Sequence, residues 1–128
     1  MAKTITVLFV DDDPYVHKIL SDFMRNAGLD VLSATSGEEA LAVAWSFAGD
    51  IRILITDVMM PGMSGPELAK ELVQSRPAMK VLLISAFPEF TAIPDESWQF
   101  MSKPFPAHML LEKIREMCPP ESTAGAPA

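Results

Sequence analysis

The stretch "VLFVDDDP", Val7–Pro14, places three aspartates directly behind four apolar residues. The apolar run, which extends back to Ile5, is too short and too β-branched for a helix and is typical of a buried strand. Three carboxylates within a few ångströms of one another repel by on the order of several kcal/mol at an effective dielectric constant of about 20. A raised pKa or a bound cation would relieve this repulsion. The stretch therefore predicts a buried strand with a charged site at its end.

Apolar runs alternate with helical patterns along the rest of the chain. The expected strands are Ile5–Val10, Val31–Ala34, Ile51–Thr56, Lys80–Ser85 and Gln99–Ser102. Between and after them, apolar residues at spacings of three and four predict helices that begin near Pro14, Ser36, Pro66 and Pro106. Strands that alternate with helices predict an α/β fold, in which one parallel sheet is covered by helices on both faces.

Polar side chains stand at the carboxyl ends of three expected strands. Asp11 and Asp12 follow the first, Asp57 follows the third, and Ser85 ends the fourth. In an open parallel sheet, ligands bind outside the carboxyl ends of the strands. Carboxylate oxygens favour a hard cation such as Mg²⁺. The sequence therefore predicts a Mg²⁺ site at this edge of the sheet.

Length and composition narrow the class of protein. The 128 residues suffice for one domain, and 49% apolar with 21% charged residues indicates a soluble globular chain, not a disordered one. A net charge of −7 without a cationic cluster argues against direct contact with nucleic acid. The single cysteine, Cys118, excludes an internal disulfide, and no apolar run reaches the length of about 20 residues that spans a membrane. With no secretory leader visible, we expect no membrane contact and a cytoplasmic location.

Four motifs, in the order "VLFVDDDP", "LITDVMMPGMSGPEL", "VLLISAF" and "FMSKPF", resemble the receiver domain of two-component response regulators. The resemblance extends from about Thr4 to Met117, and "DVMMPGMSGPELA" is similar to receivers of hybrid histidine kinases. It implies a flavodoxin-like, doubly wound five-stranded sheet with strand order 2-1-3-4-5. It also implies a receiver domain at 1–118, and the linker-like composition of 119–128 predicts a tail without regular structure.

The resemblance implies a phosphoacceptor signalling domain and not an enzyme, one that promotes only its own aspartyl phosphorylation and dephosphorylation. Asp57 would take a phosphoryl group from a phosphohistidine, Lys103 would pair with that group, and Ser85 would hydrogen-bond it. Phe100 stands at the family's aromatic switch position. The implied partners are a histidine kinase or a histidine phosphotransfer protein, and the linker-like tail would suit an effector domain beyond it.

Mg²⁺ is the cofactor that the resemblance implies. Asp12 would bind the ion directly and Asp11 through water, while Asp57 and the backbone carbonyl of Met59 would complete the protein ligands. Asp13 is instead expected to be an acid in the first turn of the following helix, where the helix dipole favours it.

The stretch between Ser85 and Lys103 departs from the pattern of the family. It holds only seventeen residues, and Pro88 and Pro94 within it oppose a continuous helix. We therefore expect the fourth helix of the family to be short, irregular or missing in this chain.

A competing interpretation is a Mg²⁺-dependent phosphohydrolase of the haloacid dehalogenase type, which also uses an aspartate nucleophile. Those enzymes need a second aspartate two residues after the nucleophile, but Asp57 is followed by Val58 and Met59. Asp11 and Asp13 have the required spacing without the surrounding motif. A receiver that works without phosphorylation is a third interpretation, and the presence of every implied site residue disfavours it.

Overall fold

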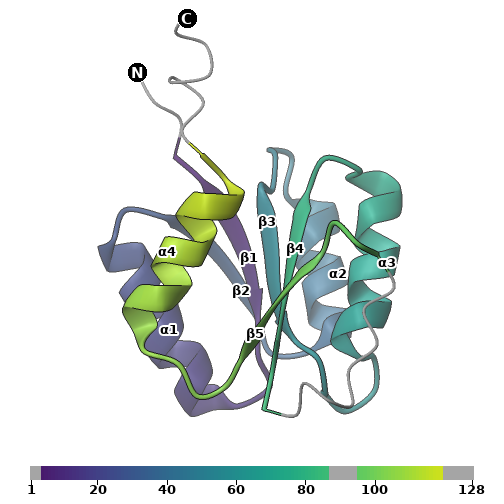
Figure 1. The fold of residues 1–128 in the computed structure, drawn as a ribbon. Coiled ribbons are helices and arrows are strands. Elements are labelled where there is room, and N and C mark those ends of the chain that lie inside the picture. Colours follow the sequence, from purple (N-terminus) through teal and green to yellow (C-terminus); the bar gives the residue numbers. More distant parts are fainter. Residues whose placement is uncertain (1–3, 87–94, 120–128) are drawn as a thin grey trace, which may run out of the picture.

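The computed structural model describes residues 4–86 and 95–119, which fold as an α/β protein (Figure 1). Strands and helices alternate along most of the chain, and their bounds are β1 (Thr6–Val10), α1 (Pro14–Asn26), β2 (Asp30–Ala34), α2 (Gly37–Ser46), β3 (Ile53–Asp57), α3 (Gly65–Ser75), β4 (Lys80–Ser85), β5 (Gln99–Ser102) and α4 (Ala107–Met117). No helix in the described ranges is long and apolar enough to cross a lipid bilayer. The predicted fold class is confirmed.

The five strands form one parallel sheet in the order β2-β1-β3-β4-β5, as predicted. The order reverses beside β1, because the chain adds β2 on one side of this strand and β3 on the other. In the register of the sheet, Asp57 pairs with Ile84, and Ser85 pairs with Ser102. The carboxyl ends of the strands therefore meet at one edge, where the predicted site residues lie.

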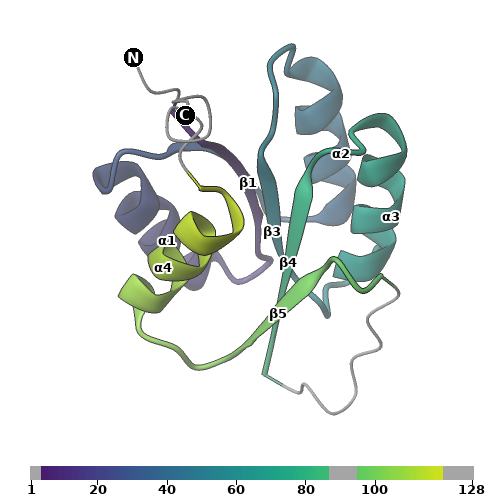
Figure 2. The same cartoon turned by 45° about the horizontal axis from the view of Figure 1, so that its top comes forward.

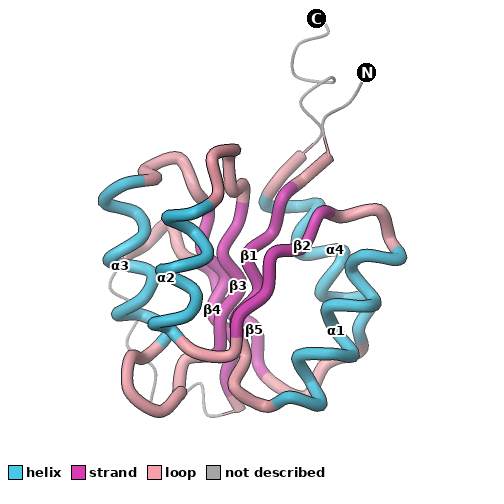
Figure 3. Tube along the Cα trace, turned by 180° about the vertical axis from the view of Figure 1, so that it is seen from behind, coloured by secondary structure: helices cyan, strands magenta, loops and turns pink. Residues whose placement is uncertain are grey.

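Helices cover both faces of the sheet: α1 and α4 lie on one face, and α2 and α3 lie on the other (Figures 1 and 3). When the top of the molecule is turned forward, the sheet is seen to separate the two helix layers (Figure 2). Leu8 and Val10 belong to the apolar cluster under α2 and α3, whereas Val7 and Phe9 belong to the cluster under α1 and α4. This division follows from the alternation of side chains along a strand. It explains why β1 is apolar on both faces.

Asp13 caps the start of α1. Its Oδ1 atom accepts hydrogen bonds from the backbone N–H groups of Tyr15, at 2.9 Å, and Val16, at 3.3 Å. The expectation that Asp13 lies within the first turn is therefore wrong. Pro14 takes the first helical position, where its missing N–H costs nothing, and Asp13 precedes it as the N-cap.

The starts of α2 and α3 are also capped by side chains. Ser36 accepts from the backbone N–H of Glu39 at 3.0 Å, as the sequence predicts. Ser64 and Glu67 form a reciprocal capping box, in which each side chain accepts from the backbone N–H of the other residue. These caps fix where the two helices begin relative to the sheet edge that carries the acidic residues.

The prediction of a short, irregular or missing fourth helix concerns mainly residues 87–94, which lie outside the described residues. The described residues that follow form a turn, in which the backbone N–H of Trp98 donates to the carbonyl of Asp95 at 3.1 Å. Trp98 is buried and packs in the cluster under α2 and α3. The predicted tail, 119–128, is described only at Pro119.

Candidate functional site

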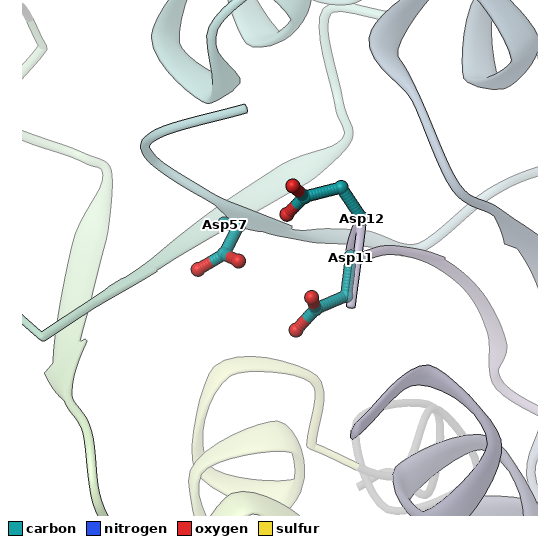
Figure 4. A group of neighbouring side chains, drawn as sticks. All are labelled: Asp11, Asp12 and Asp57. Atoms are coloured by element: carbon teal, nitrogen blue, oxygen red, sulfur yellow. The ribbon is translucent and has the colours of Figure 1, made fainter. Parts of the chain in front are cut away.

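Three carboxylates meet at the carboxyl edge of the sheet (Figure 4). Asp11 and Asp12 directly follow β1, and Asp57 ends β3; one oxygen of each lies within 4.8 Å of one oxygen of the others. Asp11 and Asp57 are buried, with 2% and 9% of their surfaces exposed, whereas Asp12 is exposed. The cluster that the sequence predicts therefore forms, with two desolvated carboxylates and one facing solvent.

Lys103 reaches the same cluster from the loop after β5. Its Nζ atom lies 3.0 Å from Oδ1 and 3.1 Å from Oδ2 of Asp57, and 3.5 Å from Oδ2 of Asp11. The backbone N–H of Lys103 donates to the carbonyl of Ser85 at 2.9 Å, and the peptide bond to Pro104 is cis. The loop after β5 thus brings the ammonium group of Lys103 against the carboxylates of Asp57 and Asp11.

The electrostatics of the cluster shift two pKa values. Burial, together with the charge of Asp11, raises the pKa of Asp57 to about 6, although the hydrogen bond and charge of Lys103 act in the opposite direction. Burial by itself would lower the pKa of Lys103, but its contacts with Asp57 and Asp11 outweigh this effect and raise it. Lys103 therefore stays charged at neutral pH, while Asp57 is a less acidic carboxyl than usual.

The loop after Asp57 is held at both ends by backbone hydrogen bonds. The N–H of Val58 donates to the carbonyl of Ile84, and the N–H of Gly65 donates to the carbonyl of Val58, each at 2.9 Å. A Cβ atom at position 65 would overlap the carbonyl oxygen of Asp57, so only glycine fits there. Met59, within this loop, has 68% of its surface exposed. The loop therefore returns closely on the end of β3 and leaves Met59 at the surface.

Ser85 and Phe100 lie where the sheet register predicts. Ser85 is buried at the end of β4, one position beyond the residue that pairs with Asp57. Phe100 in β5 is half-buried, pairs with Leu83 and packs against the cluster under α2 and α3. Ser85 thus lies beside the cluster, at the end of the strand next to β3, whereas Phe100 lies two strands from β3 and further inside the sheet.

Two hydrogen bonds of the site do not follow from the sequence patterns. The backbone N–H of Asp13 donates to Oδ1 of Asp11 at 2.9 Å and so orients this carboxylate. The hydroxyl of Thr56 donates to the carbonyl of Asp57 at 3.0 Å. The Asp-Pro pair at 13–14 was the available signal for the first feature, because it marks an N-cap whose backbone turns back on the preceding strand end.

The donor set fits a hard divalent cation. Three carboxylates beside the one ammonium group of Lys103 leave an excess of negative charge. Every side-chain atom that the cluster offers as a metal ligand is an oxygen. Asp12 is exposed and the other two carboxylates adjoin it, which suits an ion that keeps several waters. The same edge could also hold a phosphoryl group beside the ammonium of Lys103.

Comparison with known proteins gives one consistent result. The family model of the "response regulator receiver domain" matches residues 7–115. The sensor kinase CckA of Brucella abortus (strain 2308) is 32% identical over 91% of this chain, which spans only 13% of that kinase. The matched range contains the acidic cluster and Lys103.

Two solved structures share the fold. The receiver domain of the hybrid histidine kinase CckA has a TM-score of 0.78 and 34% identity, covering 88% of this chain and 97% of that one. The response regulator TrrA of Thermotoga maritima, solved in complex with Mg²⁺ and BeF, has a TM-score of 0.76 and 30% identity, covering 89% and 99% of the two chains.

Proposed function

Because this chain belongs to the response regulator receiver domain family, we propose that it is the phosphoacceptor module of a two-component phosphorelay, with Asp57 as the acceptor. The observation that carries the proposal is the position of Lys103, whose ammonium contacts both oxygens of Asp57 beside two further carboxylates. A cation held against one carboxylate of an acidic cluster is the arrangement that a transferred phosphoryl group requires.

In the proposed reaction, an oxygen of Asp57 attacks the phosphorus of a phosphohistidine. An O–P bond forms, the P–N bond breaks, and its electron pair leaves with the imidazole. Lys103 neutralises charge on the phosphoryl oxygens, and Ser85 hydrogen-bonds the group once it is bound. The burial of Asp57 supports this role, because electrostatic contacts are stronger in a desolvated site than in water.

Receivers bind Mg²⁺, and we assign its ligands here to the acidic cluster. Asp12 would bind the ion directly and Asp11 through water, with Asp57 and the carbonyl of Met59 as further ligands. When bound, the ion screens the negative charge that otherwise opposes the approach of a phosphate to a carboxylate. The hydrogen bond from the backbone N–H of Asp13 to Oδ1 of Asp11 keeps the Asp11 carboxylate in place.

The acyl phosphate adds about −1.5 to −2 charges at a rigid sheet edge. We propose that Ser85 moves toward it and that Phe100, half-buried on the adjacent strand, repacks in response. Such a local change can alter a protein-interaction surface. The output would then be a change in binding and not the turnover of a substrate, so the only chemistry of the chain would be its own phosphorylation and dephosphorylation.

Receivers pair with histidine kinases, and we propose that the phosphodonor here is a histidine kinase or a histidine phosphotransfer protein. The small share of the CckA kinase that this chain spans supports a module that works with further domains. We further propose that the receiver domain ends at residue 118, that an effector domain lies beyond the tail, and that the protein is cytoplasmic.

The test is incubation with acetyl phosphate, with and without Mg²⁺, followed by intact mass spectrometry. We expect one phosphoryl adduct that requires Mg²⁺ and is absent from Asp57→Asn. The matched control is Asp50→Asn, an exposed aspartate in the segment before β3, which should still form the adduct. Continuous turnover of phosphomonoesters would instead support the phosphohydrolase interpretation and overturn the proposal.

A further inference from the structure

The connection from β2 to α2 contacts both parts of the chain that carry the acidic cluster. We call residues 34–37, from the last residue of β2 to the first of α2, the brace. At one end of it, the carbonyl of Ala34 accepts from the backbone N–H of Asp11 at 3.2 Å. At the other end, Gly37 packs against Met63, in the loop that follows Asp57. The brace therefore links the end of β1 with the β3–α3 loop.

The contact between Gly37 and Met63 leaves no room for a side chain on the helix. A Cβ atom at position 37 would lie 2.8 Å from Cβ of Met63 and 3.0 Å from its Cγ and Sδ atoms. Cβ atoms in proteins essentially never approach a non-bonded heavy atom within 3.0 Å. Because the overlap includes Cβ of Met63, rotation of its side chain cannot relieve it, and the loop backbone itself would have to move.

A second close approach lies beside the first. A Cβ atom at Gly62 would meet Oε2 of Glu38 at 3.1 Å, and Gly62 has a φ of 78°, which favours glycine. The start of α2 is thus in close contact with two successive residues of the loop. Figure 3 shows α2 and α3 side by side on this face, with the loop entering α3 at the same end.

The brace is itself held firmly to α2. Oε1 of Glu39 accepts from both the backbone N–H and the hydroxyl of Thr35, at 2.6 and 3.0 Å, and the Glu39 N–H donates to Ser36. The hydrogen bonds from Thr35 lower the pKa of Glu39 below its usual range, so this carboxylate stays ionised and keeps both bonds at neutral pH. A side chain at position 37 would therefore displace the loop and not the brace, because these hydrogen bonds hold the brace in place.

We propose that Gly37 and Met63 are positioning residues for the cation site. Their contact sets the distance between the loop after Asp57, which includes Met59, and the aspartates that follow β1. This inference rests on the proposed function, since it assigns the loop to cation binding. Neither residue touches the ion; each acts through the backbone of the loop, in the way that residues behind metal ligands set metal affinity.

The test is calorimetric titration of the full chain with MgCl₂ near neutral pH. Gly37→Ala should weaken Mg²⁺ binding about tenfold, within the range for residues that support metal ligands. The double variant Gly37→Ala, Met63→Gly should recover part of the affinity and bind Mg²⁺ about as tightly as Met63→Gly alone, because removal of Cβ at position 63 makes room for Cβ at position 37. The matched control is Gly49→Ala, whose Cβ would meet the ring of Phe47 at 3.0 Å away from the site, and its affinity should be unchanged.

A second measurement separates positioning from loss of fold. In thermal unfolding in EDTA, Gly37→Ala and Gly49→Ala should both show a cooperative transition at similar temperatures. Only Gly37→Ala should bind Mg²⁺ weakly. If Gly37→Ala does not fold, Met63→Ala decides, and it should bind Mg²⁺ more weakly than the wild type because the loop loses its packing.

Wild-type affinity in a folded Gly37→Ala, or no recovery in the double variant, would overturn the inference while the wild type still binds Mg²⁺ and takes up phosphate. If Gly37→Ala does not fold, wild-type affinity in Met63→Ala would overturn it. Absence of binding in the wild type itself would instead overturn the proposed function.

Discussion

The ammonium of Lys103 lies 3.0 and 3.1 Å from the two oxygens of Asp57, so a single cation spans the whole carboxylate. The two residues are 46 positions apart and come from the ends of β5 and β3, which are not neighbours in the sheet. Lys103 reaches Asp57 from the loop after β5. The hydrogen bond from the Lys103 N–H to the carbonyl of Ser85 holds this loop against the end of β4. The charge balance of the site therefore depends on an element far from Asp57 in sequence.

Replacement of Lys103 should impair phosphoryl transfer more than cation binding. For Lys103→Met we expect the rate of phosphorylation by acetyl phosphate to fall by roughly 10²- to 10³-fold, the usual loss for one electrostatic contact to the reacting group. Mg²⁺ affinity should not fall, because removal of a positive charge leaves the carboxylates more attractive to the ion.

The matched control for Lys103→Met is Lys113→Met, which removes a lysine whose partners are Glu116, at 3.1 Å, and Gln99, at 3.0 Å, on the surface of α4 and β5. Its phosphorylation rate should match that of the wild type. Equal rates in both variants would show that the contact between Lys103 and Asp57 has no part in the reaction.

The raised pKa of Asp57 predicts a pH dependence of stability in the absence of metal. In the unfolded chain, Asp57 loses its proton around the ordinary pKa of 3.8. In the folded protein it keeps this proton until the pH reaches its raised pKa of about 6. Stability should therefore fall as the pH rises through this window, since the unfolded state binds fewer protons there. At neutral pH the full cost, on the order of 1–3 kcal/mol, is present.

The measurement is urea unfolding in EDTA at about pH 7.5 and about pH 4.5, for the wild type and Asp57→Asn. Acidic groups away from the cluster, such as Glu39 with its lowered pKa, contribute equally to both proteins, so the difference between them reports Asp57 together with its contacts to Asp11 and Lys103. Asp57→Asn should be more stable than the wild type at the higher pH, and this advantage should shrink at the lower pH. A constant difference at both values would contradict the assignment of the shift to Asp57.

Gly65→Ala should strongly destabilise the fold. A Cβ atom there overlaps the carbonyl of Asp57 at the end of a central strand, so backbone would have to move. We expect a loss of about 3 kcal/mol or more in the free energy of unfolding, in the upper range for overpacking at a rigid site. Chemical denaturation of this variant beside Gly49→Ala, which meets only a side-chain ring, measures it. Losses of equal size would mean that the close approach at Gly65 carries no special constraint.

Asp13→Ala should cost about 1 kcal/mol of stability, the usual value of an N-cap. Because the N–H of Asp13 also donates to Asp11, a displaced helix start should weaken Mg²⁺ binding as well. The control is Asp22→Ala, which removes the exposed ion pair with Lys18 on the same helix and should cost about 0.5 kcal/mol or less. A cap variant as stable as this control would mean that Pro14 starts the helix without help.

Much of the fold follows from local patterns. Apolar runs located all five strands, and the helix starts at Pro14 and Ser36 followed from proline and capping chemistry. The differences lie at boundaries: the apolar run predicts a strand from Ile51, but β3 begins at Ile53. Ile51 is apolar and buried like a strand residue, but it packs under α2 and α3 before the ladder begins, which no local pattern reveals. The strand order itself followed from the family resemblance.

The site was predictable in its members but not in its geometry. Strand ends indicated Asp11 and Asp57, and the motif "FMSKPF" indicated Lys103, but their distances depend on the sheet register and on the loop after β5. The roles of Gly65 and Gly37 were not predicted, because a glycine that is required by a distant contact looks like any other glycine in sequence. The residues that hold the site are thus harder to find than those that form it.

Chemical identification of the phosphorylated residue tests directly whether Asp57 is the phosphoacceptor. The protein is incubated with acetyl phosphate and Mg²⁺ and then treated with borohydride, which reduces an aspartyl phosphate to homoserine, and its peptides are sequenced by mass spectrometry. We expect homoserine at position 57 in the presence of Mg²⁺ and unmodified Asp57 in its absence. Reduction at another aspartate, or unmodified Asp57 in folded protein that binds Mg²⁺, would contradict it.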